Sequence, residues 1–147
     1  NQRIGMNSRL DTLQAAVLLP KLRALREREL GALDAAAAQY ARALEGCVDL
    51  PSVPQGYGSS WAQYTVLFGN RAQRDGAQRF LRERGIPSMI YYPRGIHQQT
   101  AYAKRNFSDT DYPNTLEACA RVLSLPMHPY LTEAEQETVI RAVLEAL

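Results

Sequence analysis

Hydrophobic residues recur at spacings of three and four over the first third of the chain. Asp11 is a suitable N-cap, and a long helix is expected from there over residues 11–45. Its apolar stripe is formed by Leu22, Leu25, Leu33, Ala37, Tyr40 and Leu44. Pro20 is expected to kink or divide this helix, because proline removes a backbone donor and clashes with the preceding turn. Gly31 is a weaker interruption, and Gly46 is a suitable stop.

Apolar and polar residues alternate over residues 61–68, which predicts a half-buried antiparallel strand. One face carries Ala62, Tyr64, Val66 and Phe68, and the other carries Trp61, Gln63, Thr65 and Leu67. A second strand is expected over residues 88–92, where Pro93 stops it. A short third strand is expected over residues 122–125, directly before Pro126.

The remaining helices alternate with these strands. One is expected over residues 74–84 and another over residues 114–121, while a T-x-x-E capping box at Thr132 starts the last. The apolar stripe of that last helix is Val139, Ile140, Val143, Leu144 and Leu147. Residues 94–112 are mostly polar and irregular, which is typical of a functional or disordered loop. The order predicts an α+β fold, with a small mixed or antiparallel sheet covered by helices.

Length and composition limit the classes that remain. The chain has 147 residues, of which 46% are hydrophobic and 22% charged, as in one soluble globular domain. A net charge of +2 is too small to argue for a nucleic-acid partner, and no apolar run approaches the roughly 20 residues of a membrane span. Cys47 and Cys119 lie among apolar neighbours and are interpreted as reduced thiols in or near the core. We therefore expect a cytoplasmic protein with neither nucleic acid nor membrane as a partner.

Few residue patterns in the chain predict chemistry by themselves. A Gly-rich phosphate loop, a C-x-x-C pair and an H-E-x-x-H motif are all missing from the sequence. His97 and His128 are the only histidines, so a multi-histidine metal site is impossible and no metal is expected. Each histidine by itself is most simply a surface or packing residue.

Three clusters remain unusual, at residues 5–9, 91–97 and 123–129. The first places the amide of Asn7 and the guanidinium of Arg9 beside a helix N-terminus, which favours a phosphate or a carboxylate. The alternative is that both side chains only cap or solvate the chain.

These clusters, in this order, resemble the C-terminal domain of the DegT/DnrJ/EryC1/StrS family of pyridoxal-phosphate (PLP) enzymes. The family's G-x-N-x-R…Q-A-A stretch matches residues 5–16, its Y-P…H-x-Q-x-A-Y segment matches residues 92–102, and its L-S-L-P-x-H-P matches residues 123–129. Residues 7–16 followed by residues 18–22 are most similar to one subgroup. That subgroup aminates the 3-keto group of UDP-2-acetamido-2-deoxy-3-oxo-glucuronate for bacterial surface polysaccharides.

The resemblance implies a role for each matching residue. Asn7 corresponds to the asparagine that reaches into the neighbouring subunit and binds the PLP phosphate. Arg9 matches a position near the bound sugar nucleotide, where a guanidinium suits a uronate carboxylate. Tyr92 matches a tyrosine that contacts substrate, and Tyr91 stands where the subgroup often has histidine. His97 lies in the loop on the substrate side. The substrate-binding residues implied are therefore Arg9, Tyr91, Tyr92 and His97.

The chain departs from the family pattern in two places. PLP aminotransferases need a lysine that binds PLP covalently and then acts as a general base, and the family carries it in a large N-terminal domain. Neither Lys21 nor Lys104 fits that role, so no catalytic residue is expected in this chain. Arg94 and Gly95 replace the more usual P-x-P pattern. Residues 1–147 are therefore expected to be the small C-terminal domain of a fold-type I enzyme, inactive by itself.

The function implied is the C-terminal part of an aminotransferase that moves an amino group from glutamate to a keto-sugar nucleotide. The substrate implied by the subgroup is UDP-3-keto-N-acetylglucosaminuronate, used for polysaccharides such as O-antigen. A homodimer through the missing domain is also implied. Two alternatives stay open: a non-catalytic module that binds a sugar nucleotide, and a PLP-dependent sugar dehydratase of the same family.

Overall fold

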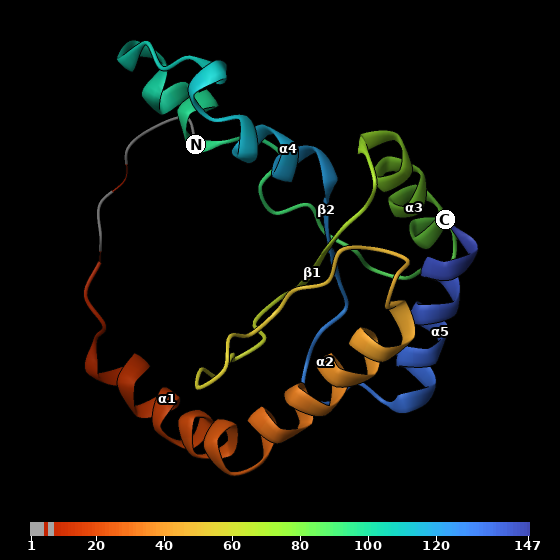
Figure 1. Ribbon diagram of the computed structural model, residues 1–147. Coiled ribbons are helices and arrows are strands. Elements are labelled where there is room, and N and C mark those ends of the chain that lie inside the picture. The colour runs from red at the N-terminus through yellow and green to blue at the C-terminus, as the bar shows by residue number, and fades with distance from the viewer. Residues whose placement is uncertain (1–4, 6–7) are drawn as a thin grey trace.

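The computed structural model describes residue 5 and residues 8–147, and Figure 1 shows the chain as an open ring. Its elements are α1 (Thr12–Ala24), the π-helical turn η1 (Leu25–Glu29), α2 (Leu30–Leu44), β1 (Tyr64–Leu67), α3 (Arg71–Glu83), the 3₁₀ turns η2 (Ile96–Gln98), η3 (Thr100–Arg105) and η4 (Asp109–Asp111), α4 (Pro113–Arg121), β2 (Val122–Leu125) and α5 (Glu133–Glu145). The helix α1 forms an arm on one side of the ring, and the sheet with α2, α3 and α5 forms the body on the other. None of the helices in the described ranges combines the length and apolar character needed to cross a bilayer.

The sheet consists of β1 and β2, which pair in antiparallel orientation. The second strand predicted over residues 88–92 is wrong, because that segment forms only one isolated bridge, between Met89 and Ser124. The two residues exchange backbone hydrogen bonds of 3.0 and 2.8 Å. Pro87 and Pro93 flank the segment and have no amide proton, which limits the ladder at both ends. Residues around Met89 therefore run beside β2 without becoming a full strand.

Among the described residues, α2, α3 and α5 cover one face of the sheet. Tyr64 and Val66 point to that face and are buried, as the alternation predicts, together with their cross-strand neighbours Leu125 and Leu123. The core that they form with α2, α3 and α5 includes Tyr40, Leu44, Phe68, Ala77, Leu81, Val139 and Val143. The α+β prediction of an antiparallel sheet covered by helices is confirmed.

The first helix does not break at Pro20. Proline leaves the carbonyl of Ala16 without its usual partner, but α1 has no buried residue, so water can reach that carbonyl. The helix is interrupted at η1 instead, where the amide of Leu30 donates to the carbonyl of Leu25 in a widened turn. Figure 1 shows the chain bending there between α1 and α2. The single helix predicted over residues 11–45 is therefore two helices joined by a π-turn.

Two predictions of burial are also wrong. Leu22 was assigned to the apolar stripe, yet 51% of it is exposed, and the buried stripe begins only at Leu33. Cys47 is exposed rather than near the core, whereas Cys119 is half-buried; both thiols are free. Leu22 precedes the bend at η1 and therefore lies outside the surface that α2 packs against the body.

A buried arginine joins α3 to the junction of α4 and β2. Arg74 is 4% exposed and donates from Nη1 to the carbonyls of Cys119 and Val122, at 3.3 and 3.0 Å. Its Nε donates to Asp75 at 2.6 Å, which compensates the buried charge and holds the pKa of that carboxyl below its usual range. These bonds satisfy two carbonyls at the end of a helix and the start of a strand.

Two tyrosines meet in the core with different hydrogen bonding. The rings of Tyr40 and Tyr64 lie 5.0 Å apart. The Tyr40 hydroxyl donates to the Pro126 carbonyl at 2.9 Å, whereas the buried Tyr64 hydroxyl has no partner among the described residues. Burial raises the pKa of both tyrosines.

We predict that Tyr64→Phe leaves stability unchanged or raises it, because it removes a buried hydroxyl that forms no hydrogen bond. The matched change Tyr40→Phe should lower the free energy of unfolding by about 1 kcal/mol, because the Pro126 carbonyl loses its donor. Urea unfolding of both variants, followed by circular dichroism, measures the difference. A Tyr64→Phe loss as large as that of Tyr40→Phe would contradict the assignment.

Candidate functional site

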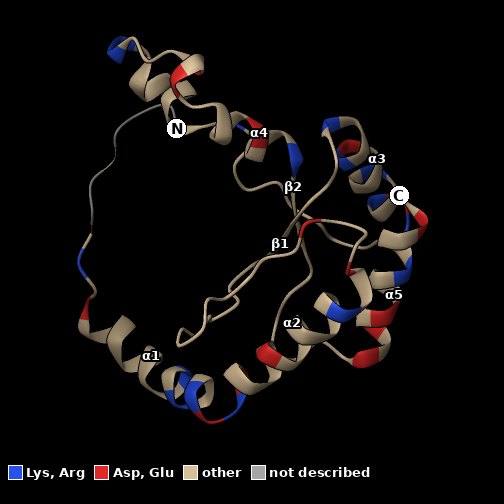
Figure 2. Ribbon diagram, viewed as in Figure 1, with Lys and Arg blue, Asp and Glu red and all other residues tan. Residues whose placement is uncertain are grey.

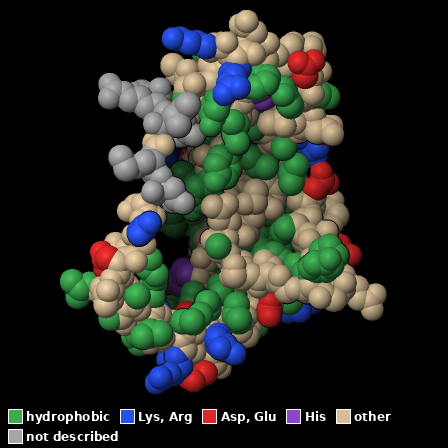
Figure 3. All heavy atoms as spheres, turned by 90° about the vertical axis from the view of Figure 1, so that its left-hand side faces the viewer, with side chains coloured by type: hydrophobic (Ala, Val, Ile, Leu, Met, Phe, Trp, Pro, Cys, Tyr) green, Lys and Arg blue, Asp and Glu red, His purple; other side chains and the backbone are tan. Residues whose placement is uncertain are grey.

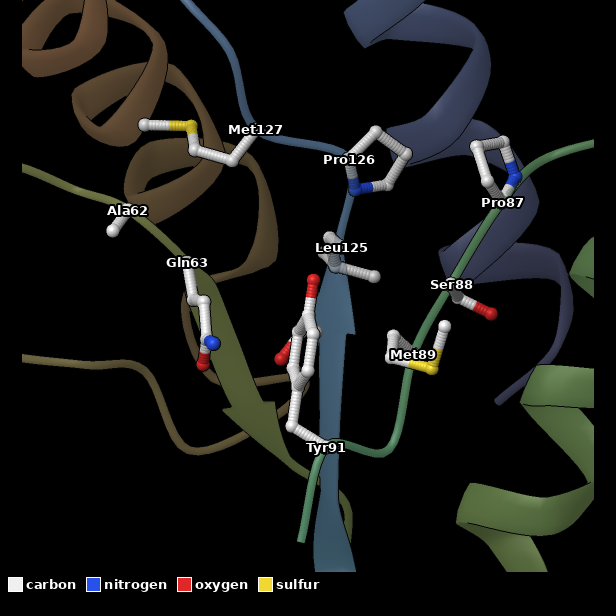
Figure 4. A pocket seen from close by; sticks show the side chains of 10 residues that line it. Ala62, Gln63, Pro87, Ser88, Met89, Tyr91, Leu125, Pro126 and Met127 are labelled. Atoms are coloured by element: carbon white, nitrogen blue, oxygen red, sulfur yellow. The ribbon is translucent and has the colours of Figure 1, made fainter. Parts of the chain in front are cut away.

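Two hollows lie on the face of the sheet opposite the core. Each has a volume of about 190 Å³, and Gln63, Met89, Tyr91 and Ser124 line both. The first continues along residues 125–127, and the second continues toward the end of α4. Figure 4 shows the Tyr91 ring standing between Gln63 and Met89, in front of β2. The two hollows are therefore neighbours that share Tyr91 in their lining.

The floor of the hollows is polar but mostly satisfied. The hydroxyls of Thr65 and Ser124 lie 2.7 Å apart across the two strands and hydrogen bond to each other. The exposed amide of Gln63, directly before β1, has no hydrogen-bond partner among the residues that the structure describes. Neither strand carries a charged residue, as Figure 2 also shows. Gln63 thus offers this face an amide that is unpaired among the described residues.

The two tyrosines predicted to bind substrate lie together. Tyr91 and Tyr92 both line the second hollow and are 50% and 71% exposed. Ile90 alone separates them from Met89, so the bridge between Met89 and Ser124 fixes the start of their segment against β2. Their hydroxyls are open to a ligand at the edge of the sheet.

His97 occupies a different environment. Only 6% of its side chain is exposed, its Nε2 lies 3.0 Å from Oδ1 of Asp109, and its ring stacks on Tyr112 with centroids 4.5 Å apart. Gln98 donates to the same Asp109 oxygen at 3.0 Å. The ring therefore holds η2 to η4, and its place is inside the loop rather than on the surface that Tyr91 and Tyr92 share.

Gly95 packs tightly against this histidine. A Cβ at Gly95 would lie 2.6 Å from Cε1 of His97 and 2.8 Å from the Thr115 methyl group. Its amide donates to Oε1 of Gln98 at 3.1 Å. The departure from the family pattern at Gly95 thus places a residue without a side chain where a side chain would clash.

The first predicted cluster lies elsewhere in the ring. Asn7, the predicted PLP-phosphate ligand, is outside the described residues. Arg9 is exposed and forms no hydrogen bond or ion pair with another described residue. It precedes α1, which Figure 1 places across the ring from β1 and β2. The structure therefore brings Tyr91 and Tyr92 together but does not bring Arg9 to them.

The arm formed by α1 exposes a large apolar surface. Leu13, Val17, Leu18 and Leu19 are between 47% and 81% exposed. Figure 3 views this side and shows hydrophobic side chains over its lower part, where α1 lies, beside a hollow. A helix that is apolar on several sides is normally enclosed by other protein surface.

Both lysines of the chain lie on its surface. Lys104 is exposed on η3. Lys21 is exposed on α1 beside Leu18 and Leu22, whose side chains give no donor for a phosphate. That the covalent PLP lysine lies outside this chain stays a prediction.

The likeness to known proteins extends over almost the whole chain. Residues 1–144 match the pattern of the DegT/DnrJ/EryC1/StrS aminotransferase family. The chain belongs to this family. DegT/DnrJ/EryC1/StrS aminotransferases depend on PLP.

Named relatives differ in the nucleotide of their substrates. The UDP-2-acetamido-2-deoxy-3-oxo-D-glucuronate aminotransferase of Pseudomonas aeruginosa is 38% identical over 96% of this chain. The dTDP-3-amino-3,6-dideoxy-alpha-D-galactopyranose transaminase of Aneurinibacillus thermoaerophilus is 32% identical over 95% of it. A solved DegT/DnrJ/EryC1/StrS aminotransferase from Brucella abortus is 46% identical over 99% of the chain, with a TM-score of 0.83. The chain spans about 38% of the length of these relatives.

Sequence reasoning missed Gln63, Met89 and Ser124 as residues that line the two hollows. A signal for Gln63 was present, because the alternation over residues 61–68 places it opposite the core. Nothing local in the sequence indicates that Met89 runs beside Ser124.

We predict that Gly95→Ala lowers the free energy of unfolding by about 1–3 kcal/mol, because the new methyl group overlaps His97 and Thr115. Gly76→Ala is the matched control: it lies inside α3 with open space around it, and should raise stability by about 0.5–1 kcal/mol. Urea unfolding measures both values, and limited proteolysis at residues 95–112 locates the damage. Equal stability of the two variants would show that Gly95 is not tightly packed.

Proposed function

We propose that this chain is the C-terminal part of a PLP-dependent aminotransferase that transfers an amino group from glutamate to a keto-sugar nucleotide. The match to an aminotransferase family over residues 1–144 carries the proposal. Its 38% share of the length of the relatives, together with two exposed lysines, supports a catalytic lysine on another part of the protein.

This chain would contribute binding groups to a site shared across a homodimer. The exposed hydroxyls of Tyr91 and Tyr92 would contact the nucleotide sugar, and Asn7 would bind the phosphate of PLP. His97 would support the site indirectly, because its contacts with Asp109 and Tyr112 hold the loop that follows the two tyrosines. Arg9, which precedes α1, would reach the substrate from a second copy of the chain, since Figure 1 places α1 across the ring from β1 and β2.

The exposed surface of α1 supports a partner for this arm. Leu13, Val17 and Leu18 would be covered by the large domain in the complete enzyme, because apolar helical surface of this extent is costly in water. The arm would then be held in a fixed orientation, as a shared site requires.

The substrate we propose is UDP-2-acetamido-2-deoxy-3-oxo-glucuronate. The enzyme would act in the cytoplasm, and its product would be used to build a surface polysaccharide such as O-antigen. The relative from Pseudomonas aeruginosa is named for this substrate. The exposed guanidinium of Arg9 suits its carboxylate, since arginine pairs with planar anions through two parallel hydrogen bonds.

The full-length protein should transfer ¹⁵N from labelled glutamate to the keto-sugar nucleotide in the presence of PLP, as detected by mass spectrometry. A binding module would retain the nucleotide sugar without any transfer. A sugar dehydratase would release water from the sugar and leave it without ¹⁵N. Either result would contradict the aminotransferase assignment.

Arg9→Lys and Arg9→Ala in the full-length protein should lower kcat/KM for the 3-keto-glucuronate nucleotide roughly ten- to a hundredfold, about 1.5–3 kcal/mol. The neutral hexose analogue should lose far less, because it has no carboxylate for the guanidinium to bind. Steady-state kinetics with both sugars measures the ratio. Equal losses would remove the uronate assignment and leave amino transfer itself intact.

A further inference from the structure

The residues that line the two hollows on the outer sheet face favour a ligand group without charge. Within the described chain, their lining contains no aspartate, glutamate, lysine, arginine or histidine. A phosphate or carboxylate taken out of water needs a charged partner or several donors. Each hollow, at about 190 Å³, has room for one ring with its substituents rather than for a whole nucleotide sugar. The group that binds here is therefore small and uncharged.

The polar side chains of the lining favour a ligand with a planar hydrogen-bonding edge. Thr65 and Ser124 share one hydrogen bond between their hydroxyls, and Ser88, Tyr91 and Tyr92 add further hydroxyls to the lining. Gln63 differs from these residues, because its planar amide offers one acceptor, Oε1, beside one donor, Nε2. Such an amide matches a ring edge on which a donor stands next to an acceptor.

The walls favour an aromatic ring. Tyr91 and Met89 stand beside Gln63, and Met127 closes the far side of the first hollow (Figure 4). Tyrosine stacks on nucleobases, and methionine adapts to the face of a planar ring. Tyr91 is half exposed, so its ring can present a face to a ligand.

We infer that this outer face is the subsite for the pyrimidine base of the nucleotide sugar, an inference that rests on the proposed function. The Gln63 Oε1 accepts from N3–H of the base, and Nε2 donates to the adjacent carbonyl oxygen. Tyr91 stacks on the ring. Uracil and thymine share this edge and differ only at C5, which fits relatives named for UDP and for dTDP sugars.

Kinetics of the full-length protein tests Gln63 directly. Gln63→Leu should raise KM for the nucleotide sugar roughly ten- to a hundredfold, because both hydrogen bonds to the base are lost. The loss should be much smaller in the half-reaction with glutamate, which involves no base. Gln39→Leu is the matched control, because Gln39 lines a hollow between α2 and α5 on the helical side. Equal KM values for these two variants would overturn the subsite.

The two cysteines provide a second readout that is independent of activity. Cys119 lines the second hollow, whereas Cys47 lines neither. Uridine 5′-monophosphate should slow alkylation of Cys119 by N-ethylmaleimide and leave the rate at Cys47 unchanged, as peptide mass spectrometry of the full-length protein would show. Gln63→Leu should abolish this protection.

The outcomes separate the subsite from the proposed function. Protection by ribose 5-phosphate as strong as that by uridine 5′-monophosphate would assign the hollow to sugar or phosphate and overturn the base. Absence of any protection would also overturn it. A full-length protein that transfers no amino group would refute the proposed function, while protection of Cys119 by the nucleotide would still support a base subsite.

Discussion

Neighbouring residues of a β-strand point to opposite faces, and the rest of this chain depends on that constraint. Four paired positions of β1 and β2 commit Tyr64 and Val66 to the core, and Thr65 to the other side. In the described part of the chain, α2, α3 and α5 cover the core side. The side that stays open carries hydroxyls, an amide and two tyrosines, so the same alternation that builds the core also builds the surface available to a ligand.

Local periodicity was sufficient to predict the elements whose apolar side packs against a neighbouring element. The stripe from Leu33 to Leu44, the strand at Tyr64–Leu67 and the last helix all follow from spacing in the sequence. The failures depend on context. Pro20 is tolerated because α1 has no buried residue in the described part of the chain, and exposure is not visible in a local pattern. The segment around Met89 pairs at one residue because prolines flank it.

The residues of the candidate site also divide into those that a local sequence pattern predicts and those that depend on distant segments. The motif that carries Tyr91 and Tyr92 predicted two side chains that do lie together, because they are adjacent in sequence. The environment of His97 depends on Asp109 and Tyr112, which return to it after an irregular loop. No spacing rule predicts such a return. Gln63 looked like an ordinary solvent-facing residue, and it becomes a lining residue only when a third segment runs beside β2.

In the proposed function, charge accounts for binding groups on two parts of the chain. The proposed substrate joins a neutral base to an anionic diphosphate and a uronate carboxylate, and a neutral hollow can enclose the base without desolvating the anionic groups. The carboxylate suits the guanidinium of Arg9, which precedes α1, and η1 joins that helix to α2 at a bend. The hydroxyl of Tyr130 donates to Glu29 in η1 at 2.6 Å and so ties the segment after β2 to that turn. The bond to Glu29 also raises the pKa of Tyr130. The turn between α1 and α2 is thus tied to the chain that continues from the sheet.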